Sequence, residues 1–464
     1  MLVVESLTAI ARGRGQSVYR CPPVVPAGFE PVPLAFHGPD ALPVVGIASR
    51  LWRTIFDPIG LVREAAAHSG DRPWTIRIPG QFDLTYLPGQ DGYDTLMGLS
   101  ASDAGMGSVF SRVPVIGMWY PRHGRIDDHD SLQELVLMGR RIMAQMLSPD
   151  RVAGLPALIE TVMRDRMRQW GTSVDLAEVL YQAVYEISIR FFAGEKFWSR
   201  FGEELIPVLR AIADGIDIPR AALAVTPARF AMREYRASRR LVGILRRAHR
   251  EIGDADSPLF AAIHAAGVHR DNCSWMTMYV LWNATAYPGS YSLWTLVDAV
   301  TDARTSEALA ATDQRTTLLS WCMWETIRLN PISSLVRSLS EPLEYSHDGH
   351  RYYLPAGTLA GVAPWLLNRD SETWDRPNDY LPERFSGVAR PRLFGAGPFS
   401  CVAAEYSRVL ITGVCDAILT AREISFPGPI PARRCRVHLT YPSGPVVAEL
   451  PVRAQKPQAV LTNA

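Results

Sequence analysis

The sequence predicts a mainly α-helical α+β fold that forms one domain over residues 1–464. Apolar residues recur at helical spacing through most of residues 57–330, and the chain becomes strand-like and rich in Pro and Gly after Pro331. Neither internal repeats nor a low-complexity linker separates these two parts. Helices followed by a small, late β part are typical of α+β domains. With 464 residues, 47% of them hydrophobic, the chain can bury one large core.

The first part begins with residues 1–50, which are Pro-rich and irregular. Asp57 followed by Pro58 is an N-cap signal with proline at the first helical position, and it predicts a helix that ends at Gly70. The alternation that follows predicts two short strands, over residues 74–78 and 84–87. The remaining periodic segments predict helices over residues 148–171, 175–194, 199–215, 226–253, 274–303 and 314–330.

The second part contains the β structure and one more helix. Residues 345–352 predict a hairpin whose turn is Asp348-Gly349. A loop-rich stretch leads to a helix predicted from Cys401 to Arg422, and a β segment is predicted over residues 436–452. Residues 453–464 have the composition of a loose tail.

Composition excludes several classes of protein. A net charge of +1 gives no basic field, so no nucleic-acid partner is predicted. Six scattered cysteines without a Cys-x-x-Cys pair argue against a zinc ribbon or disulfide framework and favour the reducing cytoplasm. Residues 274–297 carry no charge and are long enough to span a bilayer, but Asn283, Pro288 and Gly289 favour a buried central helix. No membrane anchor is therefore predicted.

One cysteine lies in an unusual setting, in the run Phe394-Gly395-Ala396-Gly397-Pro398-Phe399-Ser400-Cys401. The two glycines permit positive φ and close backbone approach. A position at the start of the following helix favours a thiolate, and the phenylalanines would exclude water from it. The run predicts a thiolate metal ligand at Cys401, with a buried free cysteine as the alternative.

A second motif, Glu325-Thr-Ile-Arg328, lies on the last long helix of the first part. A spacing of three places the carboxylate and the guanidinium on one helix face. Apolar neighbours predict that the pair is buried and closed by further hydrogen bonds; a solvent-exposed pair is the alternative. The sequence Leu381-Pro-Glu-Arg-Phe385 follows about sixty residues later.

Taken in order, four motifs resemble the cytochrome P450 family: a Glu-x-x-Arg helix, a strand with Arg337, a Pro-Glu-Arg-Phe turn and Phe-Gly-x-Gly-x-x-x-Cys. The resemblance covers most of the chain and is strongest over its C-terminal 150 residues. It implies that Cys401 is the proximal thiolate ligand of the iron in heme b (iron protoporphyrin IX). It also implies a buried structural charge cluster of Glu325, Arg328 and Arg384 that holds the cysteine loop in place.

The same resemblance implies a set of cofactor-binding residues. Arg337 matches a strand position that pairs with a haem propionate, a role that suits a bidentate guanidinium. Arg140 is a second propionate candidate, with a solvated helix face as the alternative. Phe394, Gly395 and Ala284 complete the set. The sequence departs from the family at Phe399, where an Arg or His often contacts a propionate, and at Ala403, where Gly is usual.

The third departure is in the long helix, which reads Asn283-Ala284-Thr285-Ala286-Tyr287-Pro288-Gly289. Tyr287 occupies the position of the family's usual Thr, and Pro288 predicts a kink because it lacks an N–H. Tyr287 is a predicted catalytic residue that donates a proton or hydrogen bond to bound oxygen or substrate; a packing role is the alternative. Asn283, one turn earlier, is a second catalytic candidate, with a structural amide as the alternative.

The reaction subtype stays open. The helix spacing is similar to the prostacyclin-synthase and sterol 7-hydroxylase branch, whereas Phe110–Gly117 resembles the sterol 14-demethylase type. The resemblance implies a monooxygenase that uses O2 and an external electron donor on a lipophilic small molecule or biosynthetic intermediate. A ferredoxin-type donor would meet Arg390, Arg392 and Arg408. A haem-thiolate isomerase, dehydratase or peroxide-using enzyme is one alternative, and a non-catalytic binding module is another. The expected pocket walls are residues 110–120, 279–291, 332–335 and 439–443.

Overall fold

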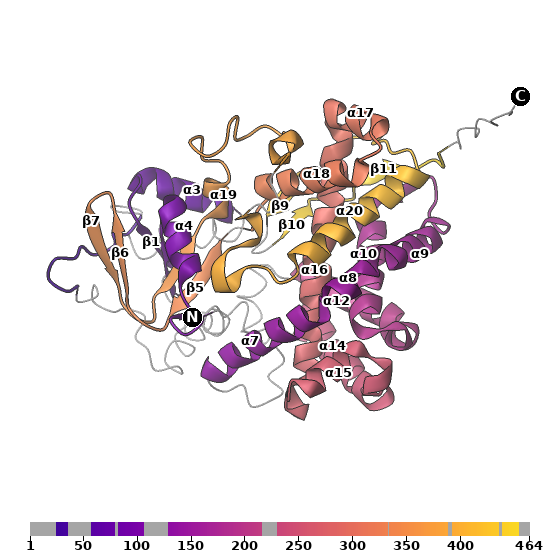
Figure 1. Cartoon of the computed structure of the whole chain (residues 1–464), viewed down its shortest axis with the longest axis horizontal. Helices are drawn as coiled ribbons and strands as arrows, with labels where there is room; N and C mark the ends of the chain where they lie inside the picture. Colours follow the sequence, from indigo (N-terminus) through magenta and orange to yellow (C-terminus); the bar gives the residue numbers. More distant parts are fainter. Residues whose placement is uncertain are drawn as a thin grey trace, which may run out of the picture.

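The protein is described from a computed structural model, which covers residues 25–35, 57–78, 82–105, 129–215, 230–332, 334–387, 392–435 and 439–453. Most helices gather on one side of the molecule, and the five-stranded sheet lies on the other side with a separate two-stranded hairpin and a few helices (Figure 1). The mainly helical α+β fold is therefore confirmed. Most of the N-terminal segment and nearly all of the tail lie outside the described residues, so the domain limits stay a prediction.

The main sheet has five strands in the order β1-β2-β8-β5-β3. β1 pairs antiparallel with β2, β2 pairs parallel with β8, and β5 pairs antiparallel with β8 and β3. β5 is an inner strand with β8 on one side and β3 on the other, so Arg337 lies in the interior of the sheet. The strands are β1 (Trp74–Ile78), β2 (Phe82–Tyr86), β3 (Ala104–Gly105), β5 (Leu335–Leu339) and β8 (Leu359–Val362).

Two local predictions beside this sheet are confirmed. The Asp57 carboxylate accepts the N–H of Gly60 at 2.8 Å and caps α3 (Pro58–Ser69), which ends at Gly70. β6 (Leu343–His347) and β7 (His350–Leu354) form the predicted hairpin. Its turn residues Asp348 and Gly349 both have positive φ, 50° and 77°, as a two-residue type I′ turn requires.

The helical body follows the predicted order with shifted boundaries. The helix predicted over residues 148–171 is two helices, because the chain breaks at Gly154 and restarts with Pro156 in the first turn. The helices of this body are α7 (His129–Met146), α8 (Pro149–Ala153), α9 (Leu155–Met167), α10 (Leu176–Ala193), α11 (Glu195–Phe197), α12 (Glu203–Gly215), α14 (Arg233–Glu251), α15 (Pro258–Ala265), α16 (Cys273–Thr301), α17 (Ala303–Ala311), α18 (Arg315–Leu329) and α20 (Ala404–Ala421).

The long helix α16 is the centre of the core. It packs against α10, α14, α18 and α20, and most of its residues are buried (Figure 1). Pro288 lies inside α16, which continues as helix to Thr301, and the predicted kink stays a prediction. Across the described part of the chain, no helix combines the length and the apolar character needed to cross a bilayer.

The C-terminal β structure is fastened to α16. β10 (Thr440–Pro442) pairs with β9 (Arg433–Cys435), and β11 (Val447–Glu449) pairs with β4 (Ser173–Asp175). The carbonyl of Thr440 accepts two hydrogen bonds from α16, from Ser290 Oγ at 2.7 Å and from Trp294 Nε1 at 2.8 Å. This double contact sets the position of β10 relative to the helix.

Candidate functional site

The cysteine loop is closed on itself before α20 begins. The backbone N–H of Cys401 donates to the carbonyl of Phe394 at 2.8 Å, and Cys401 is half-buried. α20 starts at Ala404, so the prediction that the helix begins at Cys401 is wrong by three residues. The reason is local: residues 402 and 403 form a turn, and the N-cap Ala403 has no side-chain oxygen to cap the helix.

The two loop glycines adopt the backbone that the motif predicts. Gly395 has φ of 77° and Gly397 has φ of 59°, a region that side chains with a Cβ rarely adopt. A Cβ added at Gly397 would lie 2.2 Å from the carbonyl oxygen of Met97, at the end of α4 (Gly89–Gly98). The loop therefore rests directly on the backbone of α4.

The predicted charge pair on α18 is fully buried, and the solvent-exposed alternative is wrong. Glu325 and Arg328 are 0% exposed and are joined by two hydrogen bonds, of 2.7 and 2.8 Å. Arg384, on the short 3-10 turn over Pro382–Phe385, donates its Nε to Glu325 at 3.2 Å. One carboxylate thus receives two guanidinium groups from segments about sixty residues apart.

Backbone groups complete this cluster. Arg328 also donates to the carbonyls of Asn368, Pro377 and Asp379, and the N–H of Leu381 donates to Glu325. A buried ion pair is tolerated when such further bonds occupy its remaining donors and lone pairs. The cluster ties α18 to the segment that leads into the cysteine loop, which is the structural role that the resemblance implies.

Arg337 lies beside the cysteine loop, on β5. It is 4% exposed, and its guanidinium carbon is 4.2 Å from the centre of the Phe399 ring, a cation–π contact. Burial, aided by the positive charge of Arg140, lowers the pKa of Arg337 to about 10. A buried cation whose charged form is disfavoured is a suitable partner for an incoming carboxylate, so its surroundings fit a propionate.

Arg140, on α7, contacts the same loop. Its guanidinium donates to the carbonyls of Pro398 at 3.1 Å and Ser400 at 2.9 Å, so the side chain bridges α7 and the cysteine loop. Gly139 next to it leaves room for Tyr279 of α16, because a Cβ at this position would lie 2.6 Å from the Tyr279 ring. The role of Arg140 toward a propionate stays a prediction.

Two tyrosines of α16 lie opposite Cys401. Burial raises the pKa of Tyr279 to about 12, and the charge of Cys401 adds to this effect while Arg140 opposes it. Burial, then Cys401, then Tyr279 raise the pKa of Tyr287. Tyr287 packs edge-on against Trp282, with ring centres 5.9 Å apart. The two tyrosines are therefore close enough to Cys401 for its charge to act on both.

The other predicted residues of α16 have identified contacts. The Asn283 side chain donates to the carbonyl of Tyr279, one turn earlier, at 2.7 Å, a bond that suits the structural amide; its catalytic role stays a prediction. Ala284 is buried, and its carbonyl accepts a hydrogen bond from Ser188 of α10. The sequence offered no signal for Ser188, since no motif connects it to residue 284.

The predicted pocket walls stay a prediction, although two of the predicted segments meet in the described part of the chain. Leu439 and Tyr441 of the C-terminal β segment form a small apolar cluster with Ala286, against which Trp282 and Tyr287 pack. Residues 110–120 lie outside the described residues, as does Arg390. The other two arginines of the expected donor surface form ion pairs, Arg392 with Asp94 and Arg408 with Glu405.

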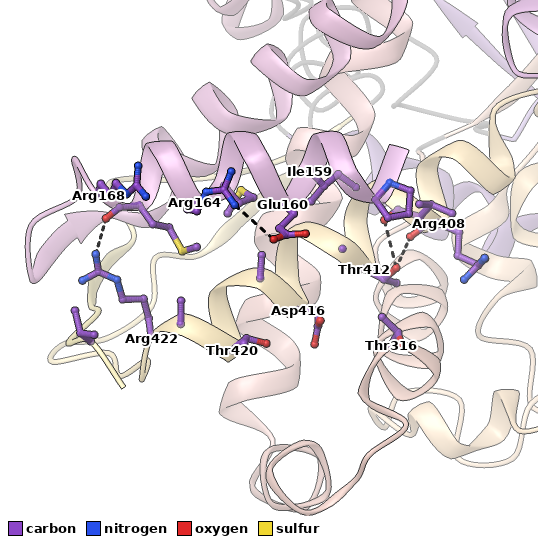
Figure 2. Close-up of a pocket in the computed structure, with 18 residues that line it drawn as sticks. Ile159, Glu160, Arg164, Arg168, Thr316, Arg408, Thr412, Asp416, Thr420 and Arg422 are labelled. Carbon is purple, nitrogen blue, oxygen red and sulfur yellow. Dashed lines mark hydrogen bonds and ion pairs between the residues drawn. The ribbon is translucent and has the colours of Figure 1, made fainter. Parts of the chain in front are cut away.

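A separate groove of about 780 Å³ runs between α9 and α20 (Figure 2). It is lined by apolar side chains such as Ile159 and Met163 and by charged residues at its margin. Arg408 of the expected donor surface lines this groove, whereas none of the predicted haem-binding or catalytic residues does. It is therefore distinct from the cysteine site.

The donor set around Cys401 fits a haem. A half-buried thiol faces aromatic side chains of α16, and two arginines reach the same loop. Within the described ranges, no three His, Cys, Asp or Glu side chains are grouped to hold a metal ion. A single thiol suits a metal that arrives with its other ligands already in a macrocycle.

Comparisons with known proteins agree with this site. The cytochrome P450 family model matches residues 297–420, which include Glu325 and Cys401. Cytochrome P450 3A29 of Sus scrofa is 29% identical over 138 residues, or 27% of this chain and 26% of that protein. The 24-hydroxycholesterol 7-alpha-hydroxylase of Homo sapiens is 27% identical over 130 residues, 26% of this chain and 27% of that protein. The matched part thus spans about a quarter of the length of these curated relatives.

A solved structure extends the similarity to most of the fold. Retinoic acid bound cyanobacterial CYP120A1 superposes with a TM-score of 0.66 at 14% sequence identity. The match covers 85% of this chain and 94% of that one. The helical body and its small sheets therefore share one architecture with that structure.

Proposed function

This chain belongs to the cytochrome P450 family, and on that premise we propose that it is a haem-thiolate monooxygenase. It acts on a lipophilic small molecule or biosynthetic intermediate, with O2 and an external electron donor. The observation that carries the proposal is the position of Cys401, on a loop fixed by two positive-φ glycines and facing the tyrosines of α16. The cysteine thiols of the described chain suit a reducing, cytoplasmic location.

Each predicted residue has a part in holding heme b. Cys401 Sγ would bind the haem iron, Arg337 and Arg140 would pair with the propionates, and Phe394, Gly395 and Ala284 would enclose the ring. When bound, the haem supplies a redox-active iron whose thiolate ligand favours O–O cleavage. The buried Glu325–Arg328–Arg384 cluster keeps the loop from moving when this charged group enters.

Tyr287 is proposed to hold a proton at its phenolic oxygen. Its raised pKa keeps the phenol protonated throughout the physiological range, so it acts as a donor and not as a base. A hydrogen bond from this oxygen would orient bound oxygen or substrate, the work that a Thr hydroxyl does in the family's usual pattern. Asn283 would assist from the preceding turn.

An apolar cluster beside Tyr287 and the names of two similar proteins support the proposed substrate class. Leu439, Tyr441 and Trp282 give an apolar, aromatic surface next to Tyr287. One relative is named as a hydroxylase of 24-hydroxycholesterol, and the similar solved structure contains retinoic acid. Both ligands are largely hydrocarbon with a polar end. We propose a substrate of this kind, and a ferredoxin-type protein as the electron donor.

The test of the proposal is the absorbance of the reduced protein with carbon monoxide. Wild type and the control Cys435→Ala should show the red-shifted Soret band of a thiolate-ligated haem, and Cys401→Ala should lose it. Cys435 is a matched control because it is also a half-buried cysteine thiol. A red-shifted band that persists in Cys401→Ala would show that another side chain holds the iron.

The Tyr287-Pro288 pair also supports a second candidate, a haem-thiolate isomerase, dehydratase or peroxide-using enzyme. Such reactions need no external electrons, and the replaced Thr is the residue that serves O–O cleavage in the usual pattern. Turnover should be measured with and without reductant under air and under argon. Product that forms without reductant, from substrate alone or with peroxide, supports this candidate over the monooxygenase.

A further inference from the structure

Pro288 leaves one backbone acceptor of α16 without its ordinary donor. In an α-helix the N–H of residue i donates to the carbonyl of residue i−4, and proline has no N–H. The affected carbonyl is that of Ala284, which is 1% exposed and therefore shielded from water. A buried carbonyl without a partner is costly, so this helix turn needs a donor from elsewhere.

That donor comes from another helix. The hydroxyl of Ser188, on α10, donates to the carbonyl of Ala284 at 3.0 Å. The hydroxyl of Tyr406, on α20, donates in turn to Ser188 Oγ at 2.9 Å. Ser188 is 0% exposed and Tyr406 1% exposed, so the two hydrogen bonds form a chain closed to solvent.

The direction of the Ser188 bond is unusual for a helix hydroxyl. Ser and Thr inside helices commonly donate to the carbonyl four residues earlier in their own helix. Three threonines of α16 do so: Thr277, Thr285 and Thr301 donate to Cys273, Leu281 and Val297. Ser188 donates instead from α10 to α16, to the Ala284 carbonyl that lacks an N–H donor because residue 288 is proline.

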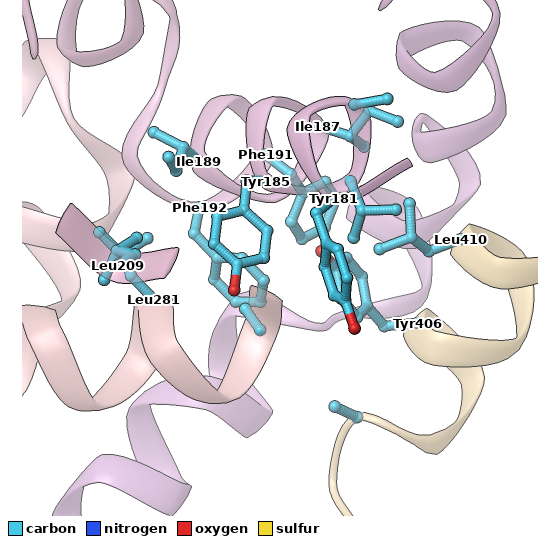
Figure 3. Packing of buried hydrophobic residues seen from close by; sticks show 14 of the residues in the cluster. Tyr181, Tyr185, Ile187, Ile189, Phe191, Phe192, Leu209, Leu281, Tyr406 and Leu410 are labelled. Atoms are coloured by element: carbon cyan, nitrogen blue, oxygen red, sulfur yellow. The ribbon is translucent and has the colours of Figure 1, made fainter. Parts of the chain in front are cut away.

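Close packing surrounds the residues of this hydrogen-bond series. The Tyr406 ring lies 5.2 Å from Phe191 and 5.3 Å from Phe192, both on α10 (Figure 3). On the α16 side, Gly289 admits Tyr181 of α10, since a Cβ there would lie 2.5 Å from that ring. Tyr406 and the turn at Gly289 are therefore both packed directly against α10.

We propose that Ser188 and Tyr406 are positioning residues for the helix turn that carries Tyr287. They replace the missing N–H of Pro288 and connect the helix that follows Cys401 to the turn facing it. The proposal that the turn is positioned relative to Cys401 rests on the proposed function; the compensation of Pro288 does not. The two parts are tested by different measurements.

The compensation is tested by hydrogen exchange of α16 peptides in a double-mutant cycle on the full-length protein. Ser188→Ala should speed amide exchange around residues 284–289 by about tenfold, the effect of losing one buried hydrogen bond. Pro288→Ala restores the N–H, so the same serine change in that background should have little effect. Tyr406→Phe should give a smaller acceleration than Ser188→Ala, because Ser188 can still donate to Ala284.

The control is Ser290→Ala, which removes a buried hydroxyl of α16 that bonds to Thr440 and not to Ala284. Its effect on exchange should be the same in the wild-type and the Pro288→Ala backgrounds. Equal acceleration by Ser188→Ala in both backgrounds would overturn the proposal. If Ser188→Ala does not accumulate as folded protein, the variant that also carries Pro288→Ala should recover it, and failure to recover would likewise overturn the proposal.

The positioning of Tyr287 is tested by the C–O stretching frequency of the reduced, carbon monoxide-bound protein, which senses a nearby hydroxyl. Tyr287→Phe defines the shift for loss of that hydroxyl. Ser188→Ala should shift the band in the same direction, and the added Pro288→Ala change should reverse it. An unchanged band in Ser188→Ala, with accelerated exchange, would limit the role of Ser188 to local stability and reject positioning. A protein that binds no haem would contradict the proposed function, but the hydrogen-exchange cycle would still test whether Ser188 compensates for Pro288.

Discussion

The cysteine loop and the helix turn that faces it are held by different forces. The loop is supported by ions: Glu325 binds two guanidinium groups, and Arg328 donates to three backbone carbonyls. The facing turn, residues 283–289, is supported by neutral groups, with hydroxyls donating to carbonyls and a glycine beneath an aromatic ring.

This difference follows the family pattern. The loop lies within the segment that matches the cytochrome P450 family model and keeps its glycines and cysteine, with departures at Phe399 and Ala403, whereas the helix turn lies outside that segment and departs at Tyr287 and Pro288. Charged clusters are rigid because breaking one bond leaves a buried charge unpaired. Neutral contacts cost less to exchange, so the facing turn is where this chain can differ without losing the fold.

The largest effect is expected on the loop side, from Glu325→Gln. The change leaves Arg328 and Arg384 without their shared carboxylate in a site that is closed to water, and should cost about 3–5 kcal/mol of folding stability. Thermal unfolding by circular dichroism and the yield of folded protein are the measurements. The control is Glu383→Gln, on the 3-10 turn that carries Arg384. The Glu383 side chain is 61% exposed, so this change should alter folding stability little. Equal behaviour of the two variants would show that the cluster is not the main support.

Gly397→Ala should follow in size. Its cost combines a positive φ with a Cβ against the Met97 carbonyl, and we expect about 2–4 kcal/mol. Gly387→Ala separates the two causes, because Gly387 has φ of 81° and no atom within 4 Å of the added Cβ. That control should cost about 1 kcal/mol. If the two variants have the same melting midpoint, the loop does not depend on close contact with α4.

Tyr287→Phe tests the facing turn without disturbing the loop. Loss of the hydroxyl should change stability by less than about 0.5 kcal/mol, because the ring and its contact with Trp282 remain. Product formed per electron pair should fall by roughly 100-fold if the phenol donates a proton. Tyr279→Phe, another buried phenol of α16, is the matched control and should retain more product. Unchanged coupling in Tyr287→Phe would assign this side chain to packing alone.

The smallest effect is a pH dependence confined to the helix side. His249 of α14 stacks on Phe260 and bonds Thr277 of α16 at 2.9 Å, and burial, followed by the charge of His264, lowers its pKa to about 4. Since the unfolded chain binds this proton near pH 6.5, stability should fall as the pH drops from 6.5 toward 4. His249→Gln should make the melting midpoint nearly independent of pH over this range. A slope that survives the substitution would place the sensitive group elsewhere.

The loop side was the more predictable of the two because its signals are local in sequence. Each signal predicts a backbone conformation or a side-chain contact from only a few residues. The signals are the glycines Gly395 and Gly397, the carboxylate and guanidinium three residues apart, and the Asp348-Gly349 turn. Pro288 likewise indicates from the sequence that one backbone N–H donor is missing from the helix. The sequence could not say which group would replace it, because Ser188 lies 96 residues from Ala284 and 218 from Tyr406.

Other differences have equally physical causes. The start of α20 depended on whether residues after Cys401 could cap a helix, and Ala403 cannot do so with its side chain. The cation–π contact between Arg337 and Phe399 joins two residues that the sequence presented separately, a strand arginine that matches the family pattern and a loop phenylalanine that departs from it. Contacts of this kind depend on how the sheet and the loop are placed, which no short motif encodes.

The paired donors at the Thr440 carbonyl limit how the binding space can be redesigned. Ser290 and Trp294 hold the backbone of β10 at a fixed separation from α16, so this wall cannot yield to a bulkier molecule by sliding outward. Enlarging the cavity on this side would require a shorter side chain at Leu439 or Tyr441. If the proposed substrate binds beside β10, we therefore expect selectivity for molecular size at this boundary to depend on these two side chains and not on loop plasticity.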